Sequence, residues 1–203
     1  MSKGKFIVLE GVEGVGKSKQ AGFLKENLAR RGIQAIVTRE PGGAPLGEKL
    51  RELILDPQYN EDAITELFMY SASRRAHLNE IVLPALNSGK IVICDRFIYS
   101  TVAYQGYGRG LDVDFIRSVN AKTIEPTEVD LALFLDLSPR DGFKRKGGAD
   151  GGDRLERENI EFFDRVYKGF CDMADGGELV RIDASGAKEQ TATLIMNEVD
   201  KIL

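Results

Sequence analysis

The sequence predicts an α/β fold built on a parallel sheet with helices on both faces. Short apolar runs rich in β-branched residues recur at 5–10, 34–39, 90–95 and 131–136, with a weaker fifth run at 178–183. Short, continuously apolar runs are typical of strands that are covered on both faces, as in a parallel sheet. Segments with helical character separate the runs, and this alternation implies right-handed crossovers. We therefore expect a doubly wound sheet of five strands.

The helices are expected between these strands. Residues 18–31 read as a first helix, which Gly32 closes as a glycine cap. Residues 63–88 give one or two helices before Gly89. Residues 160–174 give another, because their apolar side chains recur at helical spacing.

Length and composition are those of an ordinary globular protein with one domain, residues 1–203. The hydrophobic fraction of 42% is ample for a core, and the net charge of −4 argues against general nucleic-acid binding. Cys94 and Cys171 lack metal-ligand spacing, which favours two free thiols. The apolar run near the N-terminus is too short for a signal peptide or a membrane span. We expect a cytoplasmic protein without membrane or nucleic-acid partners.

A phosphate-binding loop joins the first strand to the first helix. The sequence GVEGVGKS at 11–18 matches G-x-x-x-x-G-K-[ST] in the strand–loop–helix context that this motif requires. Its glycines let successive N–H groups face a phosphate, and the helix N-terminus adds positive potential. Lys17 suits the β- and γ-phosphates, and the Ser18 hydroxyl suits Mg²⁺. The predicted ATP-binding residues of the loop are Gly11, Val12, Glu13, Gly14, Val15, Gly16, Lys17 and Ser18. The fold is thus expected to be of the P-loop NTPase type.

Acidic and basic residues follow the predicted strands where ligands gather, beyond the carboxyl ends of a parallel sheet. Glu13 lies in the phosphate loop, Glu40 follows the second strand, and Asp95 and Arg96 follow the third. A guanidinium matches a phosphate bidentately, so Arg96 and Arg51 are candidates for holding a second, anionic substrate. Surface salt bridges are the alternative, which stays open for Arg51 above all. The pattern predicts a phosphotransferase.

A pocket for a planar base is the next candidate. Tyr70 and Arg74 stand four residues apart and share one helix face, so they could stack on a base and bond its edge. Helix packing explains Tyr70 equally well. Thr101, Tyr104 and Gln105 follow the third strand closely enough to complete such a pocket.

Two further features bear on function. The segment KRKGGADGGD at 144–153 is too rich in glycine and charge for a core, and it reads as a mobile loop or a plain surface connection. His77, the only histidine, has no second imidazole or nucleophile beside it in the sequence. A solvated or structural role is expected for it.

The motifs together resemble one family. In order along the chain they are LEGVEGVGKS, TREPGG, LFMYSASRRAHL, VICDRF, STVAYQGYGRG and DLALFLDL. Their order and spacing resemble those of bacterial thymidylate kinases, from about Phe6 to the C-terminus. The resemblance implies transfer of a phosphoryl group from ATP to dTMP, giving ADP and dTDP, with Mg²⁺ as cofactor and a homodimer as the assembly.

The resemblance also implies roles around the base. It places Tyr70 against thymine and Arg74 at the edge of the base. Thr101 and Gln105 would surround the base, and Tyr104 would crowd the sugar 2′ position.

Around the phosphates, the resemblance makes Arg96, helped by Arg51, the clamp on the dTMP phosphate. Glu13 would lie near the sugar 3′-hydroxyl and the metal. Glu40 and Asp95 would lie near the acceptor and the Mg²⁺ waters.

On the donor side, the resemblance places Asp183 and Ser185 at adenine. The metal would be held by Ser18 directly and by Asp95 through water.

A lid over the site is expected at about 140–156. The phosphate loop contains no arginine. In this respect the chain resembles those members of the family that carry the catalytic arginines in the lid instead. Together with Lys17, Arg96 and Glu13, Arg145 is our catalytic candidate. Lys144, Lys146 and Arg154 are alternatives for the lid cation.

Three other functions stay open on sequence. A kinase for another nucleoside monophosphate is the nearest, because one methyl group separates dUMP from dTMP and is worth only ~1–3 kcal/mol in a pocket. A GTPase-like switch would need N-K-x-D, and the chain offers only NAKT at 120–123. A P-loop motor could use Asp136 as its metal-binding acid, although no glutamate follows it.

Overall fold

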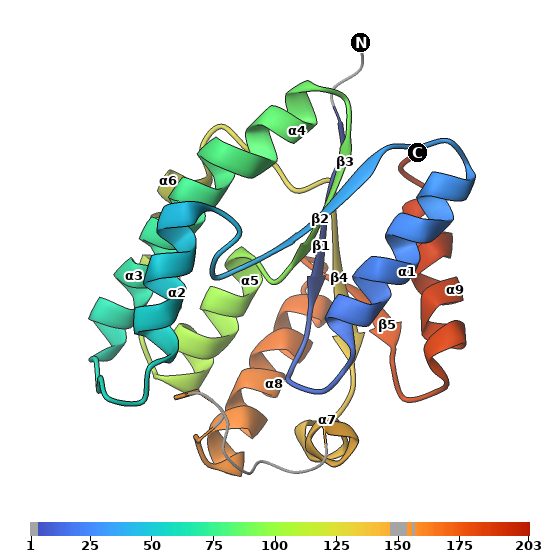
Figure 1. Cartoon of the computed structure of the whole chain (residues 1–203). Helices are drawn as coiled ribbons and strands as arrows, with labels where there is room; N and C mark the ends of the chain where they lie inside the picture. The colour runs from blue at the N-terminus through green and yellow to red at the C-terminus, as the bar shows by residue number, and fades with distance from the viewer. Residues whose placement is uncertain (1–3, 147–153, 156) are drawn as a thin grey trace.

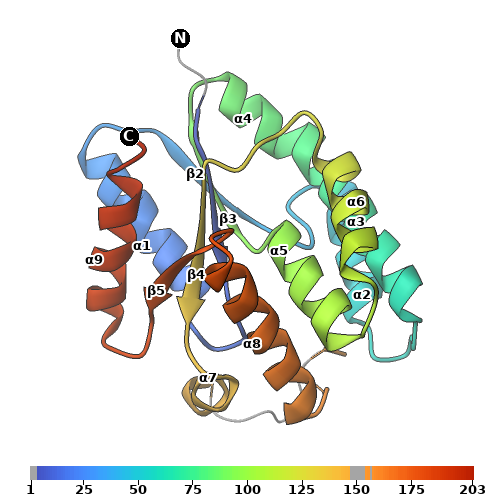
Figure 2. The ribbon, with the colours of Figure 1, turned by 180° about the vertical axis from the view of Figure 1, so that it is seen from behind.

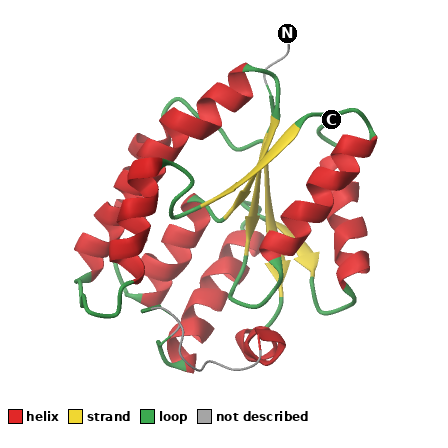
Figure 3. Ribbon diagram, in the orientation of Figure 1, coloured by secondary structure: helices red, strands yellow, loops and turns green. Residues whose placement is uncertain are grey.

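Five parallel strands form the centre of the molecule in the order β2-β3-β1-β4-β5 (Figure 1). The structure is a computed structural model that describes residues 4–146, 154–155 and 157–203, without the side chain of Lys146. The strands, shown in yellow in Figure 3, are β1 Phe6–Glu10, β2 Ala35–Arg39, β3 Ile91–Asp95, β4 Leu131–Asp136 and β5 Val180–Asp183. All five predicted strands are present, so the predicted parallel sheet is confirmed.

The helices lie on both faces of the sheet, as predicted. They are α1 Lys17–Arg30, α2 Pro45–Leu55, α3 Ala63–His77, α4 Leu83–Asn87, α5 Ile98–Thr101, α6 Val113–Ile124, α7 Pro139–Lys146, α8 Ile160–Asp175 and α9 Lys188–Val199. Two π-helical segments, Leu78–Val82 and Val102–Gly108, continue α3 and α5. Figures 1 and 2 show α1 and α9 side by side on one face, with α4, α5 and α8 on the other. No helix in the described part of the chain is both long enough and apolar enough to span a membrane.

The central strand β1 is buried on both sides. Ile7 and Leu9 pack in the cluster that includes α1, whereas Phe6 and Val8 pack against Leu78–Val82 and α4. This two-sided burial explains why the run is continuously apolar rather than alternating.

The parallel register brings the carboxyl ends of the strands to one edge. Leu9 pairs with Asp95, Arg39 also pairs with Asp95, and Glu10 pairs with Phe134. The residues that follow β1, β2 and β3 therefore meet at one rim, as the sequence predicts.

Two helix ends differ from expectation. The first helix ends at Arg30, with Arg31 as its cap, and Gly32 follows the cap with φ 74°. The N–H of Gly32 donates to Ala29 O, and the N–H of Ile33 donates to Leu28 O. This is a Schellman motif, which uses glycine one position beyond the cap. The predicted loop at 144–153 was wrong at its start, because Lys144–Lys146 continue α7. The rest of that loop, 147–153, lies outside the described residues.

Candidate active site

The phosphate loop connects β1 to α1 through backbone conformations that favour glycine. Gly11, Gly14 and Gly16 have φ values of 140°, 75° and 93°. Lys17 Nζ donates to Gly11 O at 3.0 Å and to Val12 O at 2.8 Å, so the ammonium lies against the loop. Burial lowers the pKa of Lys17. The two hydrogen bonds hold the Lys17 amine at the place where the motif expects phosphate.

Helix α7 packs directly on this loop. A Cβ atom at Gly142 would lie 2.2 Å from Glu13 O, and one at Gly14 would lie 2.0 Å from Gly142 O. Only glycine permits this backbone approach. It brings the end of α7, with Arg145, to the cavity over the loop.

Arg145 bridges α7 to the loop after β5. Its guanidinium donates to Ala184 O at 2.8 Å and to Ser185 O at 2.7 Å. Asp183 shapes the same loop, because its Oδ1 accepts from Ser185 N at 2.8 Å. The predicted adenine residues and Arg145 thus come together.

Of the other predicted lid cations, Arg154 and Lys144 lie elsewhere, and the side chain of Lys146 lies outside the described part of the chain. Arg154 donates to Ile54 O at 2.9 Å and to Glu66 Oε2 at 2.5 Å, and it is not among the residues that line the cavity over the loop. Lys144 pairs with Asp141 on the surface.

The two predicted metal residues meet. Ser18 Oγ donates to Asp95 Oδ2 at 2.5 Å. The described residues contain no cluster of three or more histidine, cysteine or acidic side chains that could hold a metal. Mg²⁺ at a phosphate loop takes a hydroxyl, phosphate oxygens and waters rather than a cage of protein ligands, so this pair fits Mg²⁺.

Arg96 has an unusual backbone. Its φ is 70°, which is the only positive φ of a non-glycine residue in the described chain. Such strain persists where surrounding structure enforces it, and it is concentrated at functional sites. The guanidinium donates to Gly11 O at 3.0 Å and to Glu13 Oε1 at 2.5 Å. Arg96 is therefore fixed beside the phosphate loop.

Glu10 organises the turn that holds Arg96, and sequence reasoning missed it. Its Oε1 accepts from Phe97 N at 2.8 Å and Ser100 N at 3.2 Å, and its Oε2 accepts from Ser100 Oγ at 2.5 Å. Burial raises the pKa of Glu10 to about 7. The sequence does contain a signal for this residue, since Glu10 is an acid at the end of a strand that is otherwise continuously apolar.

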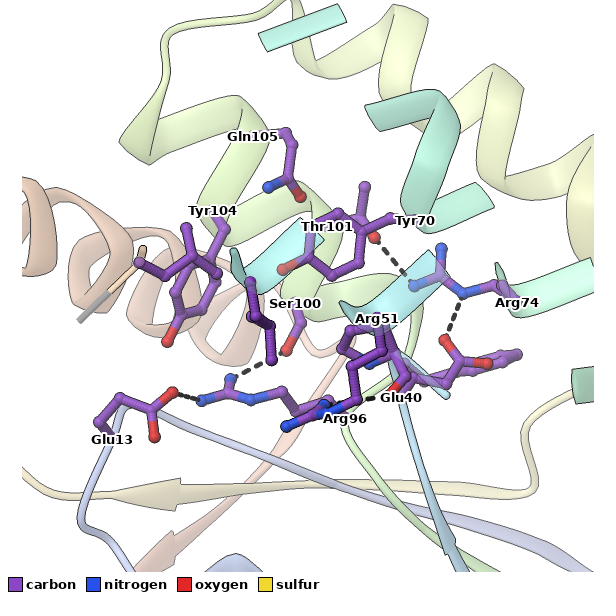
Figure 4. Close-up of a pocket in the computed structure, with 14 residues that line it drawn as sticks. Glu13, Glu40, Arg51, Tyr70, Arg74, Arg96, Ser100, Thr101, Tyr104 and Gln105 are labelled. Atoms are coloured by element: carbon purple, nitrogen blue, oxygen red, sulfur yellow. Dashed lines mark hydrogen bonds and ion pairs between the residues drawn. The ribbon is translucent and has the colours of Figure 1, made fainter. Parts of the chain in front are cut away.

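A cavity lies beside the phosphate loop (Figure 4). All the predicted substrate residues line it: Glu40, Arg51, Tyr70, Arg74, Arg96, Thr101, Tyr104 and Gln105. The structure therefore brings the whole predicted set together.

This cavity and the one over the phosphate loop have a common wall. Glu13, Glu40, Arg51 and Arg96 line both of them. Two ligands bound in the two cavities would meet at these two acids and two arginines.

Arg74 has a structural role beyond the predicted one. It is 1% exposed, and it donates to Glu40 Oε2 at 2.7 Å, Asn120 Oδ1 at 3.0 Å and Thr101 Oγ1 at 2.9 Å. A guanidinium has five N–H groups, so these bonds leave donors for a ligand. His77 holds the other oxygen of Glu40 at 2.9 Å and is buried. Of the solvated and structural roles expected for His77, the structure supports the structural one.

Tyr70 and Tyr104 both line this cavity. The Arg96 guanidinium lies 5.1 Å from the centre of the Tyr104 ring. The buried Tyr104 hydroxyl has no hydrogen-bond partner among the described residues, and burial raises the pKa of Tyr104 and of Tyr70. A buried polar atom at a cavity wall is normally satisfied, which points to a ligand as its partner.

The residues on which the switch and motor alternatives depend are engaged elsewhere. Asp136 accepts from Tyr167 Oη at 2.7 Å and from Arg181 at 2.8 Å. Asn120 accepts from Arg74 and donates to Ile98 O at 3.1 Å. Neither faces the phosphate loop cavity.

The fold, the phosphate loop and the adjoining cavity define a P-loop nucleoside monophosphate kinase. The family model for thymidylate kinase matches residues 9–195, and the chain belongs to this family. The family phosphorylates dTMP to dTDP with ATP, so the predicted family, fold and enzyme class are confirmed.

Relatives match along nearly the whole chain. A thymidylate kinase of Psychrobacter sp. (strain PRwf-1) is 47% identical, with 100% of both chains covered. One of Halothermothrix orenii is 43% identical, with 97% of both covered. The crystal structure of thymidylate kinase from Ehrlichia chaffeensis is 32% identical, with a TM-score of 0.79, 99% of this chain and 100% of that chain covered.

Proposed function

We propose that the chain transfers the γ-phosphoryl group of ATP to the phosphate of dTMP where its two cavities meet. The observation that carries this proposal is their common wall of Glu13, Glu40, Arg51 and Arg96. A phosphoryl donor and a phosphate acceptor must lie in line within a few ångströms, and the two arginines of the common wall suit two anions.

The donor half is the cavity over the phosphate loop. We assign the ATP phosphates to the residues of 11–18, with Lys17 as their cation, and adenine to Asp183 and Ser185. When bound, Mg²⁺ would neutralise phosphate charge beside Ser18, with Asp95 reaching it through water. Support comes from the contact between these two side chains.

The acceptor half is the cavity beside the phosphate loop. Tyr70 would stack on thymine, and Arg74, Thr101 and Gln105 would bond its polar edges. Tyr104 would crowd the sugar 2′ position. In Figure 4 these side chains converge on one space above Arg96 and Glu13.

The chemistry needs no strong general base. The acceptor phosphate is already an anion, so catalysis consists of positioning and charge stabilisation. Arg96, assisted by Arg51, would hold the acceptor phosphate. Glu13 accepts a hydrogen bond from Arg96 and would hold the Arg96 side chain in place. Glu13 itself would lie near the sugar 3′-hydroxyl and the water molecules bound to the metal. Arg145 would supply the charge that the phosphate loop lacks.

We also propose that the chain acts as a single domain in a cytoplasmic homodimer. Helices α2 and α3 contact each other and expose large apolar side chains: Leu46 at 57%, Leu53 at 44%, Ile64 at 41% and Phe68 at 51%. Exposed apolar groups on adjacent helices favour an interface between two copies.

A coupled ADP-release assay tests the function. ATP is offered with dTMP, dUMP, dCMP, dGMP or AMP, and without acceptor. We expect turnover with dTMP well above the other acceptors and very little without acceptor. ATP turnover that does not depend on any acceptor would contradict the proposal and favour an ATPase.

A further inference from the structure

Glu66 on α3 is a buried carboxylate that the proposed mechanism does not use. The residue is 1% exposed, and in the described part of the chain its side-chain hydrogen bonds come from Gln105, Arg109 and Arg154. Gln105 Nε2 lies 2.6 Å from its Oε1, and Arg109 and Arg154 reach its Oε2 at 3.3 Å and 2.5 Å. Both arginines present N–H donors to this carboxylate, and an arginine side chain has no acceptor to offer in return.

The charge of Glu66 dictates how Gln105 is oriented. An ionised carboxylate only accepts hydrogen bonds, so Gln105 must present its NH₂ group to Glu66. The amide oxygen then points to the other side. Gln105 lines the acceptor cavity, and Figure 4 shows its oxygen on the side of Tyr70 and Thr101. The cavity therefore contains an amide acceptor that cannot turn into a donor.

We propose that Glu66 is a positioning residue that makes the acceptor cavity selective for a pyrimidine whose ring N3 carries a hydrogen. Thymine and uracil donate from N3, whereas N3 of cytosine is a lone pair. A lone pair facing the Gln105 oxygen would leave two buried acceptors unpaired, which a closed site rejects strongly. This inference rests on the proposed function, and it names the part of the substrate that is selected.

The substitution Glu66→Gln tests the idea. A neutral amide at this position can donate to or accept from Gln105, so both orientations of Gln105 become available. The quantity measured is kcat/KM for dTMP, dUMP and dCMP at saturating ATP. We expect the ratio of dTMP to dCMP to fall at least about tenfold, the effect of losing one fixed hydrogen bond. The ratio of dTMP to dUMP stays unchanged, since both donate from N3, and KM for ATP is unchanged.

The matched control is Glu158→Gln. Glu158 pairs with Arg109 at 2.5 Å, so the substitution removes the same kind of charge beside the same arginine. It does not touch the partner of Gln105. We expect wild-type selectivity from it.

Unchanged selectivity in folded Glu66→Gln would overturn the proposal, because a merely structural role lowers all acceptors together. Should Glu66→Gln fail to fold, Gln105→Leu keeps Glu66 and both arginines, and the same loss of selectivity is expected. A wild-type ratio from Gln105→Leu would also overturn the proposal. Wild-type enzyme without turnover on dTMP or dUMP would instead contradict the proposed function itself.

Discussion

The two halves of the candidate site are built differently. The phosphate loop consists of consecutive residues, with glycines at positive φ and one lysine lying against the loop. The acceptor cavity is lined by side chains from several elements far apart in the sequence, among them α2, α3, α5 and the π-helical segment Val102–Gly108, and buried charges such as Arg74 and Glu66 lie in or beside it. A backbone site depends little on distant residues, whereas a site of buried charges carries part of the fold's stability.

The largest effect on stability is expected from Arg74→Met. It leaves Glu40 buried without its ion-pair partner, which costs about 3–5 kcal/mol of unfolding free energy. Urea unfolding measures this loss. The double variant Glu40→Gln/Arg74→Met should be closer to wild type than Arg74→Met alone, because no uncompensated charge is left. In folded Arg74→Met, KM for dTMP should rise more than KM for ATP, and equal rises would count against base binding by Arg74.

The opposite behaviour is expected of Lys17→Met in the phosphate loop. Turnover should fall about 10²–10³-fold, as for removal of one fixed donor to the reacting group. The free energy of unfolding should change by only about 1 kcal/mol, since Lys17 bonds only backbone carbonyls of its own loop. The coupled assay and urea unfolding measure the two quantities. A large loss of stability would show that the loop is not independent of the rest.

Glu10, which holds the turn after Arg96, gives a smaller, pH-dependent effect on stability. Its pKa is raised from 4.5 to about 7, so the unfolded chain releases this proton first as pH rises. The folded state then binds more protons, and its stability falls between about pH 4.5 and about pH 7, by about 3 kcal/mol in total. Unfolding of wild type and Glu10→Gln across this range measures the difference, because the variant lacks the carboxyl. Parallel curves would contradict the assignment.

The sequence predicts the backbone half of the site better than the side-chain half. The five strands and the phosphate loop depend on neighbouring residues, so a linear pattern reveals them. Glu66 meets Gln105 and Arg154 across 39 and 88 residues of chain, and no local pattern marks such a pair. The extension of α7 over Lys144–Lys146 was missed because glycine and charge beyond it suggested a loop.

The resemblance identified the residues of the acceptor cavity, yet not how they are held. Arg74 was expected at a base edge, and its bonds to Glu40 and Asn120 were not foreseen. Arg145 was the chosen lid candidate, and Arg154 was one of the alternatives. Their separate partners, the loop after β5 and Glu66, depend on the folded arrangement.

The kinetics of Arg96→Gly test most directly whether the two halves meet at the arginine that they share. Glycine takes φ 70° without strain, so the turn should keep its conformation, and urea unfolding checks that the variant is folded under the assay conditions. Turnover of dTMP should nevertheless fall about 10²–10³-fold, because the acceptor phosphate loses its clamp. A folded Arg96→Gly protein that phosphorylates dTMP at close to the wild-type rate would contradict the proposed site.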